Sequence, residues 1–176
     1  FLGKIKNVNY ESDNISYYKD EKTSELFGAL GYLSKVDFFK RANNENDHLL
    51  TPKILLRYAP GHMRKQDIDE GVRLDAENAF DLDRLNSFNN FEKGMSATLG
   101  FDYKIRNTNT DTDQFSLQIG QIINSDENKE MPSSTSLDEK ISDLVGIAEI
   151  VAGTNVKFNY NFALDQNYTE MNYNEL

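Results

Sequence analysis

The chain of 176 residues contains no cysteine, so neither a disulfide framework nor a thiolate metal site can form within it. Its three prolines and ten glycines exclude collagen-like and proline-rich classes. It has no run of about 18 apolar residues, which excludes a helical membrane span. The formal net charge of -10, with no basic stripe, argues against nucleic-acid binding, because phosphate neutralisation requires clustered Lys and Arg.

The composition fits two kinds of β protein. Mean hydropathy is low, at -0.66, and charged residues make up 27% of the chain. A soluble β-sandwich has such values. An outer-membrane barrel has them too, because each strand turns one face to a polar interior and the loops carry charge. The chain begins with Phe1 rather than Met, and we expect it to be an internal piece of a longer protein.

The most informative pattern is an alternation of apolar and polar residues near the end of the chain. Val156, Phe158, Tyr160, Phe162 and Leu164 share one parity, and Lys157, Asn159 and Asn161 lie between them. Strand side chains alternate with a period of two, so this pattern predicts a strand with one apolar and one polar face. Residues 95–105 repeat it. A tilted strand of about 9–11 such residues spans a bilayer.

Seven strands are predicted. Their ranges are 2–10, 25–38, 49–59, 94–105, 114–124, 143–152 and 155–165, and the parity of 143–152 stays open. Long connections are expected near 11–24, 60–93 and 125–142, with shorter ones between them. Long loops at one end and short turns at the other are typical of outer-membrane barrels. The expected fold is therefore an all-β antiparallel meander of about seven strands, part of a large transmembrane outer-membrane β-barrel.

The alternation also assigns side chains to faces. Residues predicted to face a wet lumen are Ser96, Thr98, Asp102, Lys104, Gln118, Lys157, Asn159 and Asn161. Residues predicted to face lipid are Leu99, Phe101, Tyr103, Phe158, Tyr160 and Phe162. The connection 60–93 is too apolar for a freely solvated loop, so we expect it to fold over the lumen. Its extracellular-loop candidates are His62, Arg64, Phe80, Asp83, Arg84 and Phe88, with Asp83 and Arg84 expected at the rim as a salt bridge or turn brace.

The residues offer little support for catalysis or metal binding. His62 lies near Asp67, Asp69 and Glu70 in sequence, but a metal site requires several ligands in fixed geometry, and a solvated loop is the simpler interpretation. The acidic clusters lack the spacing of an EF-hand loop. No Gly-x-Ser-x-Gly motif is present, and abundant carboxylates nominate no acid–base pair. We expect no enzyme activity, no cofactor and no metal.

Several segments, in collinear order, resemble one outer-membrane family. They are Leu50–Gly61, Phe80–Leu85, Gly94–Tyr103, Phe115–Ile123, Met131-Pro-Ser-Ser with Ser142–Gly146, and Tyr160–Asp165. Together they are similar to the barrel of LptD, the lipopolysaccharide-assembly family also known as organic-solvent-tolerance protein. The similarity covers most of residues 48–176. Each segment is only a strand and a turn, so the order of all of them carries the resemblance.

The resemblance implies a closed barrel with many more strands in the outer membrane of a Gram-negative bacterium. It also implies a role in moving lipopolysaccharide to the outer leaflet. The implied partners are lipopolysaccharide, an LptE-like lipoprotein plug, and a periplasmic lipopolysaccharide bridge reached through the rest of the protein. With a plug in the lumen, packing of the connection 60–93 on that plug is the alternative to folding over the lumen. Two alternatives stay open from the strand pattern alone: another outer-membrane barrel, either a porin or a substrate-specific receptor, and a soluble carbohydrate-binding β-sandwich.

Overall fold

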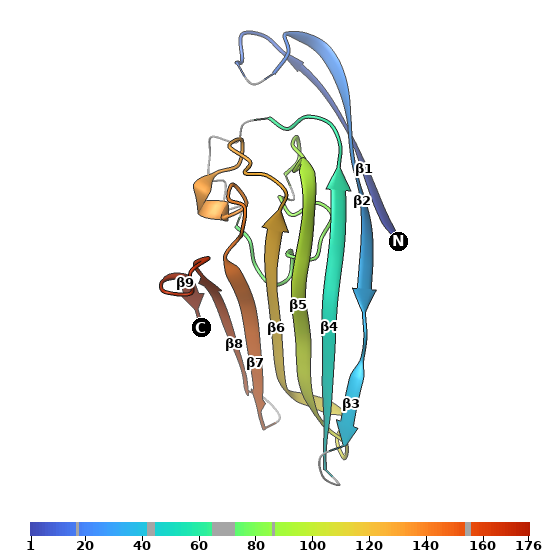
Figure 1. The fold of residues 1–176 in the computed structure, drawn as a ribbon, viewed down its shortest axis with the longest axis vertical. Coiled ribbons are helices and arrows are strands. Elements are labelled where there is room, and N and C mark those ends of the chain that lie inside the picture. The colour runs from blue at the N-terminus through green and yellow to red at the C-terminus, as the bar shows by residue number, and fades with distance from the viewer. Residues whose placement is uncertain (17, 42–44, 65–72, 86, 154–155) are drawn as a thin grey trace.

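The computed structural model describes residues 1–16, 18–41, 45–64, 73–85, 87–153 and 156–176. The chain forms one antiparallel sheet, coloured along the chain in Figure 1. Its strands are β1 (Leu2–Ser12), β2 (Glu21–Lys35), β3 (Phe38–Arg41), β4 (Asn46–Ala59), β5 (Gly94–Asn107), β6 (Thr112–Asn124), β7 (Leu144–Ala152), β8 (Val156–Leu164) and β9 (Met171–Glu175). A short 3₁₀ helix, Ser133–Thr135, lies between β6 and β7. Within the described residues, no helix is long and apolar enough to cross a membrane.

The strand order is a meander with one interruption. Neighbours along the sheet run β1-β2-β4-β5-β6-β7-β8-β9, and β3 pairs with β4 beyond the end of β2. The break between β2 and β3 lies opposite Pro52, whose carbonyl accepts a hydrogen bond from the Val36 amide at 3.3 Å. Thr51 Oγ1 donates to the Asp37 carboxylate at 2.7 Å. β2 and β3 therefore run one after the other along the same side of β4, with a braced bend between them.

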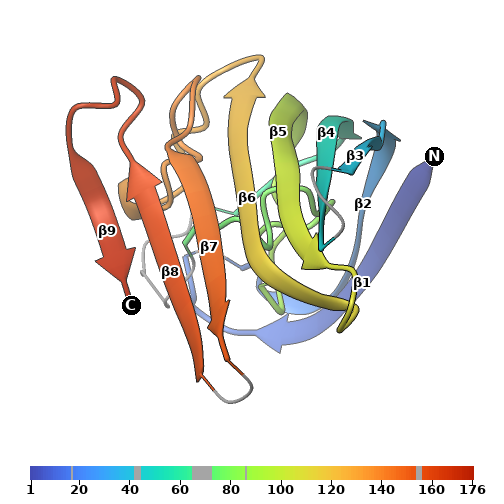
Figure 2. The same cartoon turned by 90° about the horizontal axis from the view of Figure 1, so that it is seen from below.

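The sheet curves, and its connections differ in length at its two ends (Figures 1 and 2). The connections after β1, β4, β6 and β8 lie at one end, and the tighter ones after β3, β5 and β7 lie at the other. Seen from below, the connection between β4 and β5 lies inside the curve (Figure 2). Within this connection we call residues 73–85 and 87–92 the inserted segment, and we call the side of the sheet that it contacts the inner face.

Two apolar clusters lie between the inner face and the connections. One joins Leu74, Ala79 and Leu85 of the inserted segment to Ile122 and Val145 of the sheet. The other packs Leu82 and Phe91 against Val8, Phe27 and Leu55. Burying a Leu or Phe side chain stabilises a fold by roughly 1.5–3 kcal/mol. The inserted segment is thus part of the core, and Leu55 and Ile122 are apolar at inward positions because they meet it.

The structure confirms the all-β antiparallel prediction. All seven predicted strands are present, and β3 and β9 are added to them. Both additions are short, at four and five residues, which explains why periodicity did not reveal them. The expected long loop near 11–24 is shorter, because β1 extends to Ser12 and β2 begins at Glu21. The open parity of β7 is resolved, since Val145 is fully buried on the inner face.

Candidate functional site

The strand register places all eight polar candidates on the inner face. Directly paired residues of adjacent strands point to the same side of a sheet. Asp102, Gln118, Ile147 and Asn161 form one such row across β5 to β8, and Lys104, Ser116, Glu149 and Asn159 form the next. Lys157 joins them through its ion pair with Glu149, at 2.6 Å.

The part of the inner face nearest the long connections is covered by the inserted segment. Thr98 is fully buried, and its Oγ1 donates to the Ala79 carbonyl of the inserted segment at 3.1 Å. Ser96 is also buried and accepts a hydrogen bond from Arg84 Nη2 at 3.1 Å. The wet interior that we expected at these two positions is therefore occupied by the inserted segment.

Further from the long loops, the inner face carries ion pairs between neighbouring strands. Lys53 Nζ lies 2.6 Å from Asp102 Oδ1, and Lys104 Nζ lies 2.9 Å from Asp113 Oδ2. The Lys157–Glu149 pair continues this pattern on β7 and β8. Each charge therefore meets an opposite charge, which keeps this part of the face polar with little net field.

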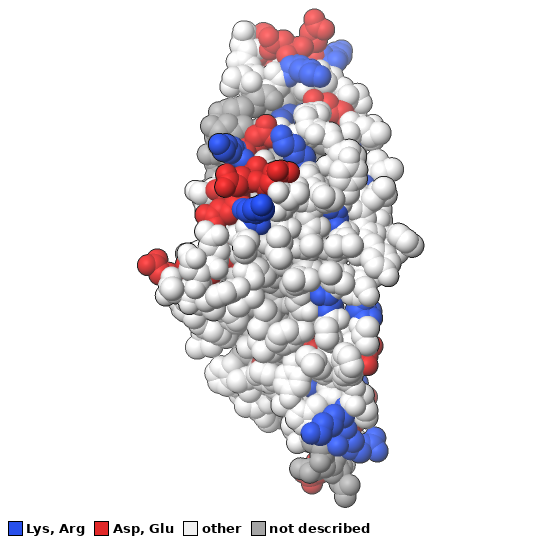
Figure 3. All heavy atoms as spheres, viewed as in Figure 1, with Lys and Arg blue, Asp and Glu red and all other residues white. Residues whose placement is uncertain are grey.

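The opposite side of the sheet, which we call the outer face, carries the six apolar candidates. The half-exposed side chains of Leu99 and Phe158 lie there, and the Tyr160 and Phe162 rings stack with centroids 5.8 Å apart. The Phe162 ring also lies directly over Gly146, where a Cβ atom would clash with it. Figure 3 shows a broad uncharged area in the middle, with charged side chains mostly toward the two ends. Exposed apolar area of this extent marks a lipid or protein interface.

A buried charge cluster of Arg57, Arg84 and Glu92 joins the inserted segment to β4. Arg84 Nε donates to Glu92 Oε2 at 2.7 Å, and its Nη2 donates to Glu92 Oε1. Arg57 on β4 donates to the carbonyls of Leu82 and Glu92, at 2.9 and 2.5 Å. Pairing of opposite charges offsets the cost of burying them, although Arg57 Nη1 and Arg84 Nη1 have no hydrogen-bond partner among the described residues.

Asp83 lies beside this cluster but pairs with β1. Its Oδ2 is 2.6 Å from Lys6 Nζ and 3.5 Å from Lys4 Nζ. Lys6 also donates to the carbonyls of Ser87 and Asn90. The expectation of a rim salt bridge or turn brace at Asp83 and Arg84 is therefore wrong: both side chains are buried and each pairs with another residue.

Arg64 fastens the start of the same connection to the β1–β2 hairpin. Its guanidinium pairs with Glu25 on β2 and lies 5.0, 4.9 and 5.6 Å from the ring centroids of Tyr10, Tyr18 and Phe27. His62 lies 3.4 Å from the other Glu25 oxygen. The acidic residues Asp67, Asp69 and Glu70, considered with His62 as metal ligands, lie outside the described residues. Among the described residues, no group of His, Asp and Glu side chains could hold a metal ion.

Phe80 and Phe88, the remaining loop candidates, differ in position. Phe80 packs over Gly100 and Gly120, which pair with each other in the middle of β5 and β6. Lys53 Nζ lies 4.3 Å from the Phe80 ring centroid. Phe88 is 90% exposed. Only Phe88 and His62 among the six loop candidates are largely exposed, and the other four hold the segment to the sheet.

The family comparison agrees with this architecture. The model of the LptD family, described as LPS transport system D, matches residues 6–176. The chain belongs to the LptD family. No curated protein matches the chain. Membership assigns the chain a role in lipopolysaccharide transport and assembly and supports the resemblance seen in the sequence; nothing favours the porin, receptor or soluble-sandwich alternatives. LptD proteins form a transport family of the Gram-negative outer membrane and are not known as enzymes.

Several residues of this LptD-family site were missed in the sequence. Arg57, Glu25 and Lys6 are charged residues at inward parities, and they hold the inserted segment. Glu92 lies just before β5 and completes the buried cluster. Arg57, Glu25 and Lys6 were visible only as single charges on the polar side of predicted strands. Their partners lie far away along the chain, so spacing alone could not pair them.

The connection between β6 and β7 gives the long-loop end of this LptD-family chain an acidic character. Burial raises the pKa of the Asp138 carboxyl, and repulsion from Glu127 adds to the rise. Burial also raises the pKa values of Glu139 and Asp143, and repulsion from neighbouring carboxylates adds to both. For Asp143, a hydrogen bond from Asn172 partly opposes the rise. Ionising these groups at neutral pH therefore costs the loop some stability.

Proposed function

We propose that this chain forms one section of the wall of an outer-membrane barrel through which lipopolysaccharide reaches the outer leaflet. In this assignment the outer face meets the acyl chains of the bilayer and the inner face lines the lumen. The observation that carries the proposal is the division of one sheet into an apolar exposed face and a charged, partly covered face. In this proposal lipopolysaccharide moves past the wall and no chemical bond is made or broken.

The two parts of the inner face have different roles in this proposal. The inserted segment narrows the lumen near the long-loop end, so that the barrel does not leave an open water channel there. The paired charges nearer the short turns, such as Lys53–Asp102 and Lys157–Glu149, keep the rest of the lumen wet. A wet wall of paired charges accepts phosphorylated sugar groups without trapping them, because each Lys already has a carboxylate partner.

The partners are proposed on the same basis. An LptE-like lipoprotein fits the uncovered inner surface between β5 and β8, where Gln118, Asn159 and Asn161 offer hydrogen-bonding groups. The periplasmic bridge would act through the rest of the protein.

Site-specific photo-cross-linking in the full-length protein in cells tests this function. A photoreactive residue at Asn159 on the inner face should capture lipopolysaccharide or the plug lipoprotein during transport. The matched position is Phe158, the next residue on the same strand, which should capture membrane lipid instead. Equal capture of the plug lipoprotein at both positions would contradict the assignment of faces.

A further inference from the structure

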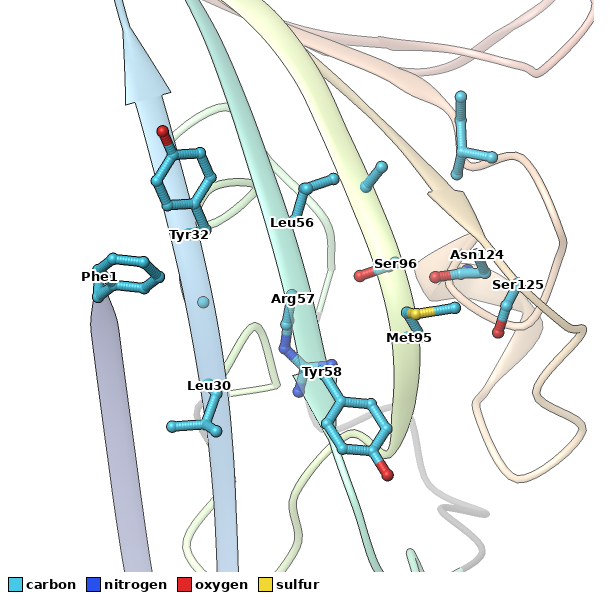
Figure 4. Close-up of a pocket in the computed structure, with 13 residues that line it drawn as sticks. Phe1, Leu30, Tyr32, Leu56, Arg57, Tyr58, Met95, Ser96, Asn124 and Ser125 are labelled. Atoms are coloured by element: carbon cyan, nitrogen blue, oxygen red, sulfur yellow. The ribbon is translucent and has the colours of Figure 1, made fainter.

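The inner face changes from buried to solvent-exposed at one level of the sheet. On the side of the long connections, Leu55, Thr98 and Ile122 pair directly across β4, β5 and β6, and all three are fully buried. The next row toward the long connections, which Figure 4 shows, is buried as well and consists of Arg57, Ser96 and Asn124. The inserted segment covers these rows, so this part of the inner face is dry.

Beyond the covered part, toward the short turns, the inner face is wet. The first row there is partly exposed and consists of Asp102, Gln118, Ile147 and Asn161. Between the dry and the wet rows lies one row in which most residues are small, and we call it the boundary row: Lys53, Gly100, Gly120, Val145 and Ala163. The covered area thus ends at the same level from β5 to β8.

Phe80 is the side chain of the inserted segment that lies on the glycines of the boundary row. A Cβ atom at Gly100 would lie 2.9 Å from a carbon of the Phe80 ring, and one at Gly120 would lie 3.3 Å from another. Glycine in a strand often marks a place where another group approaches the sheet closely. The ring also packs against both apolar clusters. Because neither glycine has a side chain, the space above the pair is filled from the inserted segment, with the Phe80 ring in contact with both.

Lys53 marks the polar side of the same contact. Its Nζ lies 4.3 Å from the centroid of the Phe80 ring and 2.6 Å from Oδ1 of Asp102, in the wet row. A cation at such a distance is attracted by the ring quadrupole. The Phe80 ring is therefore the last apolar group of the covered region here, and the Lys53–Asp102 pair is the first polar group beyond it.

We propose that Phe80 determines the seal of the lumen in this section of the wall, by excluding water and small solutes from the space between the two apolar clusters. The inference rests on the proposed function, which makes the inner face the lining of a lumen, and it names the residue on which closure depends. Without the ring, that space would be bordered by Lys53 and by the backbone of Gly100 and Gly120. Water enters a space with polar partners, whereas an apolar constriction excludes it.

The test measures solute entry through the full-length protein in proteoliposomes, purified with the subunits that it retains from the outer membrane. We expect Phe80→Ala to raise the rate of entry of arabinose, a small uncharged sugar, severalfold. The matched control is Phe88→Ala, which removes the same side chain from a 90% exposed position of the inserted segment and should leave the rate unchanged. Heat-modifiability on gels checks that each variant is folded. An unchanged rate for Phe80→Ala, or equal increases for the two variants, would overturn the proposal.

A labelling experiment covers the case in which Phe80→Ala does not assemble. Thr98→Cys lies in a dry row and Gln118→Cys in the wet row, and each is treated with a small water-soluble maleimide. We expect labelling above the background of the parent protein only at Gln118→Cys. Adding Phe80→Leu, which keeps an apolar but smaller side chain, should raise the labelling of Thr98→Cys severalfold. Equal labelling at the two positions in the presence of Phe80, or no rise with Phe80→Leu, would contradict the role of the ring.

Cross-linking at Asn159 separates this proposal from the transport role. Capture of lipopolysaccharide or of the plug lipoprotein there, together with unchanged sugar entry in Phe80→Ala, rejects only the seal. Increased sugar entry in Phe80→Ala without any such capture supports the seal and rejects the transport role. Failure of both measurements rejects both.

Discussion

Replacing Glu92 with Gln should destabilise the protein far more than a single surface change. The Arg84, Arg57 and Glu92 side chains are 0%, 1% and 3% exposed, and Glu92 is the carboxylate that faces both guanidinium groups. Glutamine keeps the shape but removes the charge, so two buried cations lose their compensation. Removing one partner of a buried pair typically costs about 3–5 kcal/mol.

The measurement is urea unfolding of the full-length barrel in detergent. The folded fraction is read on gels, where the folded form migrates differently from the heat-denatured form. The control is Glu11→Gln, whose partner Lys22 lies 4.0 Å away with both side chains largely exposed. Such exposed pairs are worth about 0–1 kcal/mol. We expect Glu92→Gln to unfold at a clearly lower urea concentration and Glu11→Gln at nearly the same concentration as the parent protein. The dependence of the unfolding free energy on urea concentration should be unchanged in both.

A double variant shows whether the effect comes from the pair. Arg84→Met together with Glu92→Gln removes the cation that is left uncompensated, so it should cost less than the sum of the two single changes, because contacting residues are not additive. Equal midpoints for Glu92→Gln and Glu11→Gln would refute the argument that buried charge holds the inserted segment. Strict additivity in the double variant would refute the pairing.

Three further outcomes follow from the same structure. Leu99→Arg should destabilise the full-length barrel by about 2–4 kcal/mol if residue 99 lies near the bilayer midplane, and its folded yield should fall. Asn159→Arg on the inner face should cost much less stability. Equal folding yields for the two variants would contradict the assignment of faces. Gly100→Ala should reduce assembly, because a Cβ atom there would clash with the Ile119 carbonyl oxygen and meet the Phe80 ring at 2.9 Å. Gly3→Ala meets only the Leu30 side chain, at 3.8 Å, and should be tolerated. Normal heat-modifiability of both variants would show that the sheet relaxes. Asp138 has a raised pKa, so its ionisation opposes folding of the β6–β7 connection at neutral pH and this penalty disappears as the pH falls through the folded pKa. Asp138→Asn should therefore slow proteolysis of that connection at pH near 7 and flatten its pH dependence, and an unchanged pH profile would contradict the assignment.

Strand existence and faces could be predicted from the sequence because they depend on neighbours in the chain. The alternation in 95–105 and 156–164 fixed the parity of β5 and β8, and the structure keeps that parity. Parity failed at β7, where apolar residues occupy both faces: Val145 meets the core, while Ile150 points outward. The core side and the exposed side of β7 are both apolar, so alternation of apolar and polar residues cannot tell them apart.

The inserted segment could be foreseen only in part. Its apolar content predicted that it would not be a free loop, and Leu82 and Leu85 are indeed buried. Its partners could not be predicted, because Lys6 and Asp83 meet only after β1, β2, β4 and β5 are assembled. Because the segment contributes to both apolar clusters, its deletion is expected to harm folding.

The contact of Lys6 with the inserted segment has a consequence for the order of assembly. Apart from β3, which pairs with β4 beyond the end of β2, the neighbours in the sheet follow the order of the chain, so these strands can add one after another. The hydrogen bond from Lys6 to Ser87 instead joins residues 81 positions apart. Contacts of such long range form late, because the loop between them must first be closed. The inserted segment can therefore dock fully only when the first strand is already in place, and a misregistered β1 would leave the buried Asp83 carboxylate without its Lys6 partner.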